Sequence, residues 1–309
     1  MYEIVKKVLQ REGLLNFSKI EKIGSGASNI IFKVSNEKTK FIVKLNIDGN
    51  ESFENEFNSL KYIIKKGFKY CPNPICEGKF KKYNYMIQDF IPGKTLKEDK
   101  FSDLQVIKMA KFFHNLHSIK FKRHGKIPNP KKTKYSLYGV IDYAESVINS
   151  LSNKTLSIDE LDDLNNILKK AKKVIIAANN LFLDEINFSL RHGDANPLNF
   201  IENKDAIVGI DWVWACVAPP SKEIADFFNK SNINEKQKQL FYKNYHIIDK
   251  KKIDAHSLYS YLGTAIWSLD RLDKISKNKL DKQLYVSIRN EKEMYLKQIE
   301  KLKVYIKKN

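Results

Sequence analysis

The sequence pattern changes near residue 90, and this change limits the folds open to the chain. Before it, short runs rich in β-branched and aromatic residues predict two strands within 19–34 and others at 40–46, 75–81 and 83–90. After it, apolar residues recur at helical spacing, which predicts helices at 102–119, 158–181 and within 234–304. The segment FIPGKTL at 90–96 contains Pro and Gly and reads as a connector.

We therefore expect an α+β chain of two lobes. An antiparallel sheet lobe with one helix covers residues 1–90, and a mainly helical lobe covers residues 91–309, with a hinge at about 88–94. The helix of the sheet lobe is predicted at 52–66, with Ser52 as its N-cap. Its inward-facing residues are expected to be Phe53, Phe57, Leu60, Ile63 and Ile64. A further amphipathic helix is expected at 2–15, and Leu104, Ile107, Phe113 and Leu116 repeat at helical spacing in 102–119.

Composition narrows the class of protein further. The 309 residues contain no run of 18 or more apolar residues, and the N-terminus alternates apolar and charged positions. The three cysteines, Cys71, Cys76 and Cys216, are odd in number and lack metal-ligand spacing. We expect a soluble protein without a membrane span, in the reducing cytoplasm.

The formal charge of +19 does not by itself indicate nucleic-acid binding. Only five of the 55 basic residues are Arg, and Lys is scattered through every segment. Because Arg is the side chain best suited to reading phosphates and bases, this distribution favours a compositional bias over a binding surface. No nucleic-acid partner is expected.

Three polar residues stand where short strands end in the second half of the chain. Asp194 and Asn199 lie in RHGDANPLNF at 191–200, and Asp211 follows the apolar run AIVGI. A carboxylate and an amide oxygen about a dozen residues apart across a hairpin can share a hard cation such as Mg²⁺. Asp194 is then free to accept a proton from a substrate hydroxyl.

The first half of the chain carries residues that suit phosphate binding. Gly24 and Gly26 lie between two predicted strands, where backbone amides can approach phosphate oxygens closely. Lys44 ends the next strand, and a Glu on the following helix can hold that Lys in place. Each of these signals is weak alone; their order along the chain is the evidence.

That order resembles the aminoglycoside phosphotransferase and choline kinase superfamily of kinase-like enzymes. HGDANPLNF is similar to the His-Gly-Asp-x-x-x-x-Asn loop of that family, and VGIDW to its Ile-Asp-Trp segment. LHSI at 116–119, FIPGKTL and SGASNIIFKV also resemble family stretches, so that the likeness covers roughly residues 18 to 230. It implies a bilobal protein-kinase-like fold and a small-molecule kinase that uses ATP, or GTP, with Mg²⁺.

Site roles follow from this resemblance residue by residue. Asp194 corresponds to the catalytic base, Asn199 and Asp211 to the Mg²⁺ ligands, and Lys44 to the contact of the α- and β-phosphates with Glu56 as its partner. The nucleotide would further be held by Ser25, Gly26, Ala27 and Ser28 over the phosphates and by backbone groups near Gln88 and Phe90 around adenine. His192 would brace the loop, and Asp226 would tie it down.

The acceptor stays open at this level. Trp212, Trp214 and Trp267, with Tyr138 and Tyr143, would suit an aromatic box for a quaternary amine, and Trp267 and Asp270 lie one helical turn apart. We assign Trp214, Trp267 and Asp270 as candidate acceptor residues. The Gly of His-Gly-Asp is instead similar to the broad phosphotransferase group, because choline kinases tend to have Asn there.

Three classes of function remain. An active small-molecule O-phosphotransferase leads, for aminoglycoside, amino alcohol or sugar acceptors, with a choline or ethanolamine kinase as its narrower form. A nucleotide-binding pseudokinase and a basic nucleic-acid binder are the alternatives; Mg²⁺-dependent phosphate transfer separates the first two, and steep salt dependence is required by the third.

Overall fold

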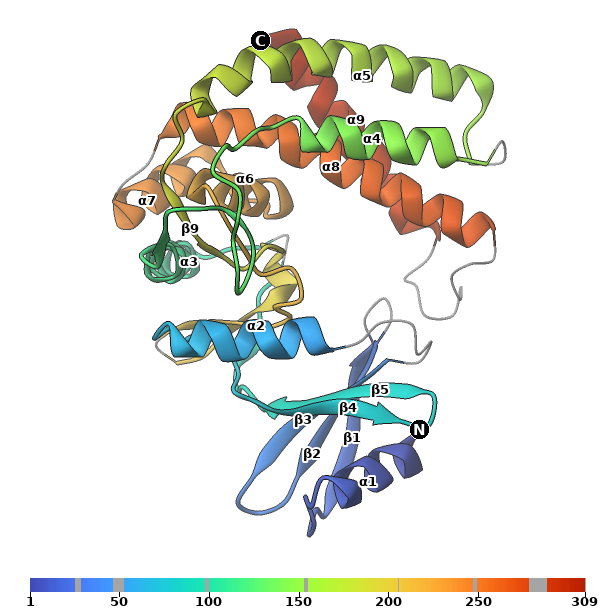
Figure 1. The fold of residues 1–309 in the computed structure, drawn as a ribbon, viewed down its shortest axis with the longest axis vertical. Coiled ribbons are helices and arrows are strands. Elements are labelled where there is room, and N and C mark those ends of the chain that lie inside the picture. Colours follow the sequence, from blue (N-terminus) through green and yellow to red (C-terminus); the bar gives the residue numbers. More distant parts are fainter. Residues whose placement is uncertain are drawn as a thin grey trace.

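Two lobes are stacked along the long axis of the molecule, the sheet lobe at one end and the helical lobe at the other (Figure 1). The computed structural model describes residues 1–25, 29–46, 53–97, 100–152, 155–204, 206–246, 249–277 and 288–308. Among these residues no helix has both the length and the apolar character needed to cross a bilayer.

The sheet of the first lobe is antiparallel, with the strand order β1-β2-β3-β5-β4. Its strands are β1 (Lys19–Ser25), β2 (Asn29–Ser35), β3 (Lys40–Asn46), β4 (Pro74–Phe80) and β5 (Tyr83–Asp89). The predicted strand positions are confirmed. Side chains alternate between the two faces, as the two-residue period of a strand requires, so that Ile30, Phe32 and Val34 of β2 are buried.

One helix covers each face of this sheet. Helix α1 (Tyr2–Arg11) buries Val5 and Val8 with the side chains of Tyr85 and Ile87 in one apolar cluster. Helix α2 (Glu54–Lys65) packs on the other face, where Met86 belongs to the same cluster as Leu60 and Ile63 of α2. The prediction that Ile64 faces inward was wrong, because its side chain is exposed. Ser52, the predicted N-cap, lies outside the described residues.

The second lobe is mainly helical. Its helices are α3 (Asp103–His117), α4 (Gly139–Ser150), α5 (Ile158–Asn179), α6 (Pro220–Lys230), α7 (Glu235–Tyr245), α8 (Lys250–Ser276) and α9 (Ile288–Lys308), with single 3₁₀ turns η1 (Asn180–Phe182) and η2 (Pro197–Asn199). Capping boxes start α3 at Ser102 and α5 at Ser157, which satisfies backbone amides left free at those ends. Leu104 on α3 is exposed, contrary to its predicted inward position.

Two of these helices were not predicted. Helix α4 begins without a side-chain cap, and α6 begins at Pro220 directly after Pro219. Proline is favourable in the first helical turn. It has no backbone amide hydrogen, and an amide hydrogen at that position would have no acceptor within the helix. The pair of prolines was therefore the sequence feature from which the start of α6 could have been predicted. This helix contributes residues to the candidate site.

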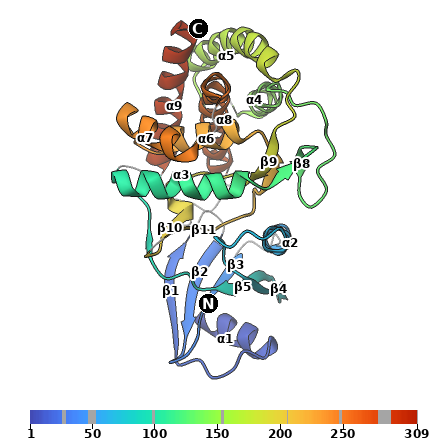
Figure 2. The same cartoon turned by 90° about the vertical axis from the view of Figure 1, so that its left-hand side faces the viewer.

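Two small antiparallel sheets of the second lobe carry the polar loops. Strands β10 (Phe200–Glu202), β11 (Ile207–Gly209) and β6 (Lys94–Thr95) form one of them, in the order β11-β10-β6. The other contains β7 (Lys120–Phe121), β9 (Phe188–Arg191), β12 (Cys216–Ala218) and β8 (Gly125–Lys126), in the order β7-β9-β12-β8. Figure 2 shows β10 and β11 between α3 and the first lobe, and β9 beside β8 near one end of α3.

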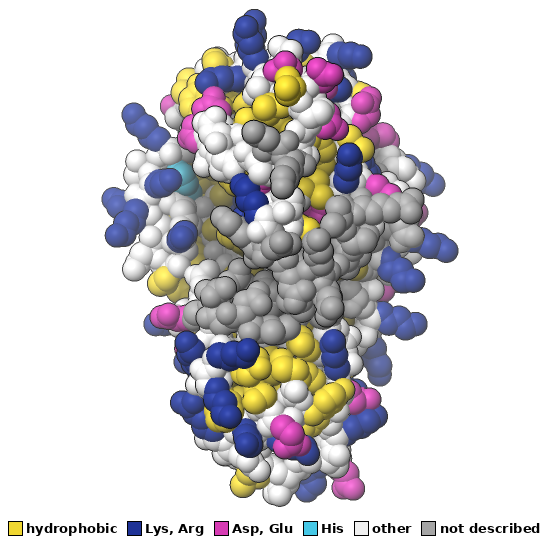
Figure 3. Space-filling view, turned by 90° about the vertical axis from the view of Figure 1, so that its right-hand side faces the viewer, with side chains coloured by type: hydrophobic (Ala, Val, Ile, Leu, Met, Phe, Trp, Pro, Cys, Tyr) yellow, Lys and Arg dark blue, Asp and Glu magenta, His cyan; other side chains and the backbone are white. Residues whose placement is uncertain are grey.

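Basic side chains are spread over the surface instead of forming one patch on the face seen in Figure 3. Lys and Arg occur around both lobes of that face, interspersed with acidic and apolar residues. The distribution agrees with the scatter of Lys along the sequence.

A buried histidine makes stability of the second lobe depend on pH. His256 contacts the hydroxyl of Tyr135 at 2.9 Å through Nε2 and the carbonyl of Lys252 at 3.0 Å through Nδ1. Burial lowers the pKa of His256 well below its usual value near 6.5, helped by the Lys222 and Arg191 charges. Since the unfolded chain then binds the proton more tightly, the stabilisation is present above pH 6.5 and is lost as pH falls below it.

We expect the His256→Gln variant to lose less stability on acidification than the unchanged chain. Each group of this kind contributes a slope of up to about 1.4 kcal/mol per pH unit below pH 6.5. Urea unfolding at pH 8, 7, 6 and 5 measures the two slopes, and pH 8 gives the direct cost of the substitution. Parallel slopes for the two proteins would contradict the assignment.

Candidate functional site

The loop after β9 brings Asp194 and Asn199 into contact. Strand β9 ends at Arg191, and the 3₁₀ turn η2 ends at Asn199. The Asn199 amide Nδ2 donates to Asp194 Oδ2 at 2.8 Å and to the Asp194 carbonyl at 3.3 Å. Because Nδ2 is used in this way, the amide oxygen of Asn199 is left for another partner.

The second carboxylate oxygen of Asp194 binds a lysine that the sequence analysis missed. Lys230, the last residue of α6, places Nζ 2.6 Å from Asp194 Oδ1. Burial alone would raise the pKa of Asp194, but the Lys230 ammonium outweighs it and holds that pKa below its usual value. The carboxylate is therefore ionised at neutral pH. The Asp194 side chain is 31% exposed.

Lys44 of β3 joins the two lobes. Its Nζ lies 2.6 Å and 2.9 Å from the two carboxylate oxygens of Glu56 on α2 and 3.3 Å from Asp211 Oδ1. Burial works against the charge of Lys44, yet the two carboxylates outweigh it and raise the pKa of its ammonium. The amide of Trp212 also donates to Glu56 at 3.3 Å, so that this ion pair contacts the segment after β11 through two residues.

Asp211 adopts the left-handed backbone region, with φ of 65°. Asp is among the residues that tolerate this conformation, which turns the chain sharply after β11. The preceding amide, that of Ile210, donates to the Asn199 carbonyl at 2.8 Å, which sets the two predicted metal ligands on adjacent backbone segments. The Asp211 side chain is 45% exposed and accessible to a ligand.

The donor set here fits Mg²⁺ and not a closed transition-metal site. Within the described part of the chain, no three His, Cys, Asp or Glu side chains gather closely enough to hold a metal by themselves. Asp211 and the amide oxygen of Asn199 offer hard oxygen ligands, and Mg²⁺ is typically held by one or two such groups with water and phosphate oxygens.

Glu223 of α6 fixes the backbone of the loop at 192–199 that carries Asp194. Its carboxylate accepts from the amides of His192 at 3.1 Å and Gly193 at 2.8 Å, and it contacts His117 Nε2 at 3.0 Å. Burial would raise the pKa of Glu223, but the hydrogen bond from His117 and the charge of Arg191 lower it to about 2. A full negative charge is thus held inside the protein by four donors or cations.

Asp226, predicted to tie the loop down, accepts from Arg191 Nη2 at 3.0 Å at the end of β9. Glu223, one turn earlier, accepts from the loop amides themselves and was not predicted. His192 is buried, contacts the Ile210 carbonyl at 2.8 Å through Nε2 and packs its ring on Trp212. It therefore links the loop to the strand end that leads into Asp211.

Gly193 stands where a side chain cannot be accommodated. Its φ is 88°, and a Cβ built on it would collide with the backbone carbonyl of Trp214. We expect Gly193→Ala to reduce the free energy of unfolding by about 2 kcal/mol or more and to lower turnover, since the loop must shift.

The matched control for this substitution is Gly139→Ala, where nothing lies within 4 Å of the added Cβ. Chemical denaturation and steady-state kinetics of both variants make the comparison. A Gly193→Ala variant as stable and active as the control variant would show that the close approach of Trp214 is unimportant.

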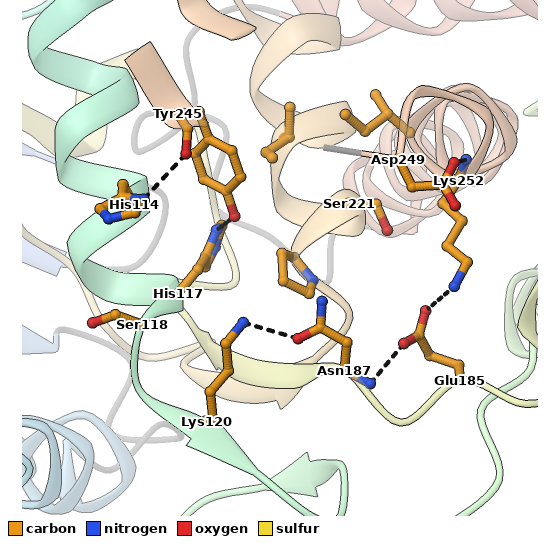
Figure 4. A pocket seen from close by; sticks show the side chains of 13 residues that line it. His114, His117, Ser118, Lys120, Glu185, Asn187, Ser221, Tyr245, Asp249 and Lys252 are labelled. Carbon is orange, nitrogen blue, oxygen red and sulfur yellow. Dashed lines mark hydrogen bonds and ion pairs between the residues drawn. The ribbon is translucent and has the colours of Figure 1, made fainter. Parts of the chain in front are cut away.

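A cavity of about 360 Å³ is walled in part by α3, α6, α7 and α8 (Figure 4). Tyr245 on its wall contacts His117 Nδ1 at 2.8 Å, and His117 in turn contacts Glu223. Lys120 donates to the amide oxygen of Asn187 at 2.8 Å, and Lys252 forms an ion pair with Glu185 at 2.8 Å. None of the predicted site residues lines it.

The structure describes only some of the residues that were predicted to hold the nucleotide. Gly26, Ala27 and Ser28 lie outside the described residues, and Ser25 is described only as the last residue of β1. Gln88 is buried in β5, and its Oε1 has no partner in the described structure. The Phe90 amide donates to the Lys40 carbonyl at 3.3 Å.

The aromatic residues proposed for a cation box do not form one. Trp212 is fully buried, with Nε1 donating to the Gly209 carbonyl at 2.8 Å, and it belongs to the core. Trp214 is exposed beside Gly193. Trp267 is half-exposed on α8, and the Arg271 guanidinium lies 4.5 Å from its ring centre.

Asp270, the other candidate on α8, has a partner as well. Its carboxylate accepts from Lys274 at 2.6 Å. Asp270 also raises the pKa of Tyr143 to about 12, after the larger effect of burial, so these two side chains lie near each other. Tyr138 is exposed at the start of α4.

Comparisons with known proteins agree with this geometry and show the family to which the chain is similar. Residues 20–302 match the family model described as choline/ethanolamine kinase. A LicA homolog from Metamycoplasma hominis is 25% identical over 280 residues, which are 90% of this chain and 96% of that protein.

Solved structures of kinase-like enzymes are similar over the whole chain. Choline kinase LicA from Streptococcus pneumoniae gives a TM-score of 0.71 at 15% identity, with 100% of this chain and 99% of that chain covered. Aminoglycoside phosphotransferase APH(4)-Ia gives 0.71 at 12% identity, with 99% of each chain covered. A structure of LicA in complex with AMP gives 0.65 at 15% identity, with 98% of each chain covered. The predicted fold class and superfamily resemblance are confirmed.

Proposed function

The chain belongs to the choline/ethanolamine kinase family and is a small-molecule kinase, and on that premise we propose that it transfers the γ-phosphoryl group of ATP to an alcohol. The observation that carries the proposal is the contact of Lys44, which Glu56 holds within the sheet lobe, with Asp211 of the helical lobe. This contact brings a phosphate-binding cation to the oxygen ligands of a hard metal ion.

Asp194 is proposed to act as the general base. It is ionised and exposed enough to meet a substrate hydroxyl, and two donors, Asn199 and Lys230, fix its orientation. The hydroxyl oxygen forms a bond to the γ-phosphorus, its proton passes to Asp194, and the bond to the bridging oxygen breaks so that ADP leaves with the electron pair. Positioning by the loop is what makes the attack in line.

Lys44 is proposed to contact the α- and β-phosphates. The Glu56 carboxylate holds its ammonium in a buried position at the interlobe contact, so that its orientation is set before nucleotide binds. Ser25, Gly26, Ala27 and Ser28 are proposed to cover the phosphates, and the backbone near Gln88 and Phe90 to meet adenine. His192 and Glu223 hold the loop and take no part in the chemistry.

Asp211 and Asn199 would hold Mg²⁺, which when bound neutralises charge on the transferring phosphate. Asp211 already lies beside the Lys44 ammonium, and Asn199 has its amide oxygen free of the Asp194 contact. The remaining positions of a magnesium ion belong to water and phosphate oxygens in sites of this kind.

A screen of ADP formation tests the proposal. Amino alcohols, aminoglycosides, sugars and hydroxy-amino acids are each offered with ATP or GTP and Mg²⁺, with Asp194→Asn as the blank and EDTA as the metal control. Acceptor-dependent ADP release that disappears in both controls is the expected result. Failure of every acceptor to raise ADP release above the blank would favour a nucleotide-binding pseudokinase instead.

Choline or ethanolamine is the second candidate at the level of the acceptor. The family match favours it, because the matching model is described as choline/ethanolamine kinase. The same screen includes both amino alcohols.

A further inference from the structure

Lys301 of the C-terminal helix α9 binds the end of α6 beside Lys230. Its Nζ donates to the Asn229 carbonyl oxygen at 2.9 Å and to Asn229 Oδ1 at 2.8 Å. Asn229 and Lys230 are the last two residues of α6, and Lys230 Nζ lies 2.6 Å from Asp194 Oδ1. Lys301, Asn229 and Lys230 therefore connect α9 to the carboxylate proposed as the general base.

The Asn229 carbonyl is one of the last carbonyls of α6, which have no partner within a helix. The chain leaves the helix at Ser231, which is extended. A lysine ammonium satisfies such carbonyls and also interacts favourably with the negative end of the helix dipole. Because this lysine comes from another helix, it attaches the end of α6 to α9 as well as capping it.

The Asn229 side chain is buried and is bonded to two other helices. Its Nδ2 donates to Ser260 Oγ of α8 at 3.0 Å, while its Oδ1 accepts from Lys301. Helix α8 packs against both α6 and α9. The end of α6 is thus held by hydrogen bonds from both α8 and α9.

Lys301 binds Asn229 without a compensating acid. Burial lowers the pKa of its ammonium to about 8, helped by the charges of Lys297 and Lys238, and no carboxylate of the described residues pairs with it. The ring of Tyr261 on α8 lies 5.6 Å from its Nζ. A buried ammonium is costly unless it is hydrogen-bonded, so the two oxygens of Asn229 offset much of this cost.

We propose that Lys301 is a positioning residue, which holds the end of α6 so that Lys230 meets Asp194 in the orientation suited to catalysis. The inference rests on the proposed function, because it takes Asp194 as the base. A small displacement of the helix end would lengthen the contact of Lys230 with Asp194. Asp194 would then lose part of its orientation and part of the charge interaction that keeps it ionised.

A double-mutant cycle tests this coupling. Turnover is measured for the unchanged enzyme, Lys230→Met, Lys301→Met and the double variant, with an acceptor found in the screen. We expect Lys301→Met to lower kcat about three- to tenfold with KM for ATP nearly unchanged, but to lower it less than about twofold where residue 230 is already Met. In Lys301→Met the acidic limb of the pH profile of kcat should also move to higher pH, since the pKa of Asp194 rises toward its usual value.

Lys303→Met is the matched control, because Lys303 lies on the same helix and pairs with Asp163 of α5 at 2.9 Å. Its kcat and pH profile should equal those of the unchanged enzyme. Lys301→Arg can donate to both oxygens of Asn229 and should retain most of the rate. Urea unfolding of each variant shows that it is folded under the conditions of the assay.

An equal fall in kcat on Lys301→Met in both backgrounds would overturn the inference, because Lys301 would then act independently of Lys230. An unchanged kcat and pH profile in Lys301→Met, or a fall of the same size in Lys303→Met, would do the same. These results leave the kinase assignment standing, because Asp194-dependent ADP release is measured in the unchanged enzyme. ADP release that persists in Asp194→Asn would instead remove the proposed function, and the inference with it.

Discussion

The Asp194→Asn variant is expected to bind nucleotide as before and to turn over about 10²–10⁴-fold more slowly. The substitution keeps the size of the side chain but removes the basic oxygen that accepts the hydroxyl proton. Nucleotide contacts are assigned to the sheet lobe, where Lys44, the proposed phosphate contact, bonds Glu56 and Asp211 and not Asp194. The loss should therefore appear in kcat, with KM for ATP nearly unchanged.

Fluorescent-nucleotide titration and steady-state kinetics measure the two quantities separately. An amide at position 194 can accept through one oxygen only, so one of its two donors, Asn199 or Lys230, loses a partner. Thermal unfolding of the same variant is the control for that effect. Turnover within about threefold of the unchanged enzyme would take Asp194 out of the role of base.

Glu223→Gln is expected to be the most destabilising of the substitutions considered for this loop. The glutamate is fully buried and serves the amides of His192 and Gly193, the ring of His117 and the charge of Arg191. Loss of one member of such a buried group leaves the opposite charge without its partner, which typically costs about 3–5 kcal/mol. We expect urea unfolding at pH 7 to show a loss of that size, and turnover to fall with it.

The pH dependence of this effect has a definite sign. Glu223 has a pKa of about 2 in the folded chain and an ordinary value of 4.5. Its contribution is complete above pH 4.5 and is lost as pH falls toward 2, so the gap between the two proteins should narrow below pH 4.5. Asp226→Asn, on the same helix, is the control, because Asp226 is also buried and bonds Arg191 without contacting the loop amides. An equal loss in both variants would contradict the special position of Glu223.

The sequence could predict the part of the site that lies in continuous segments. Asp194, Asn199 and Asp211 fall within about twenty residues, and strands β9, β10 and β11 bring them together through local hairpin geometry. Lys44 and Glu56 lie only 12 residues apart, on a strand and on the helix that follows it in the chain. Short connections of this kind restrict geometry strongly, so spacing alone carries much of the information.

Lys230 and Glu223 could not be predicted in this way, because their contacts depend on how α6 docks against the loop. They lie 36 and about 30 residues beyond their partners, and nothing in the local sequence marks either side chain. The aromatic box failed for a related reason. Trp212 was needed in the core, where His192 and Phe68 pack on it. Arg271 lies one helical turn after Trp267, a spacing that was visible in the sequence and that accounts for their contact.

The pairing of β6 with β10 determines which residues stay together if the two lobes move relative to one another. Residues 94–95 form β6, which pairs with β10, the strand that follows Asn199. Gly93 lies so close to the Glu202 carbonyl that a Cβ on it would clash. A rotation of the sheet lobe away from the second lobe would therefore bend the backbone between Asp89 and Lys94, and the contact between Lys44 and Asp211 would be lost. Asp194, Asn199 and Asp211 all belong to the second lobe, so a movement of the sheet lobe need not separate them from one another.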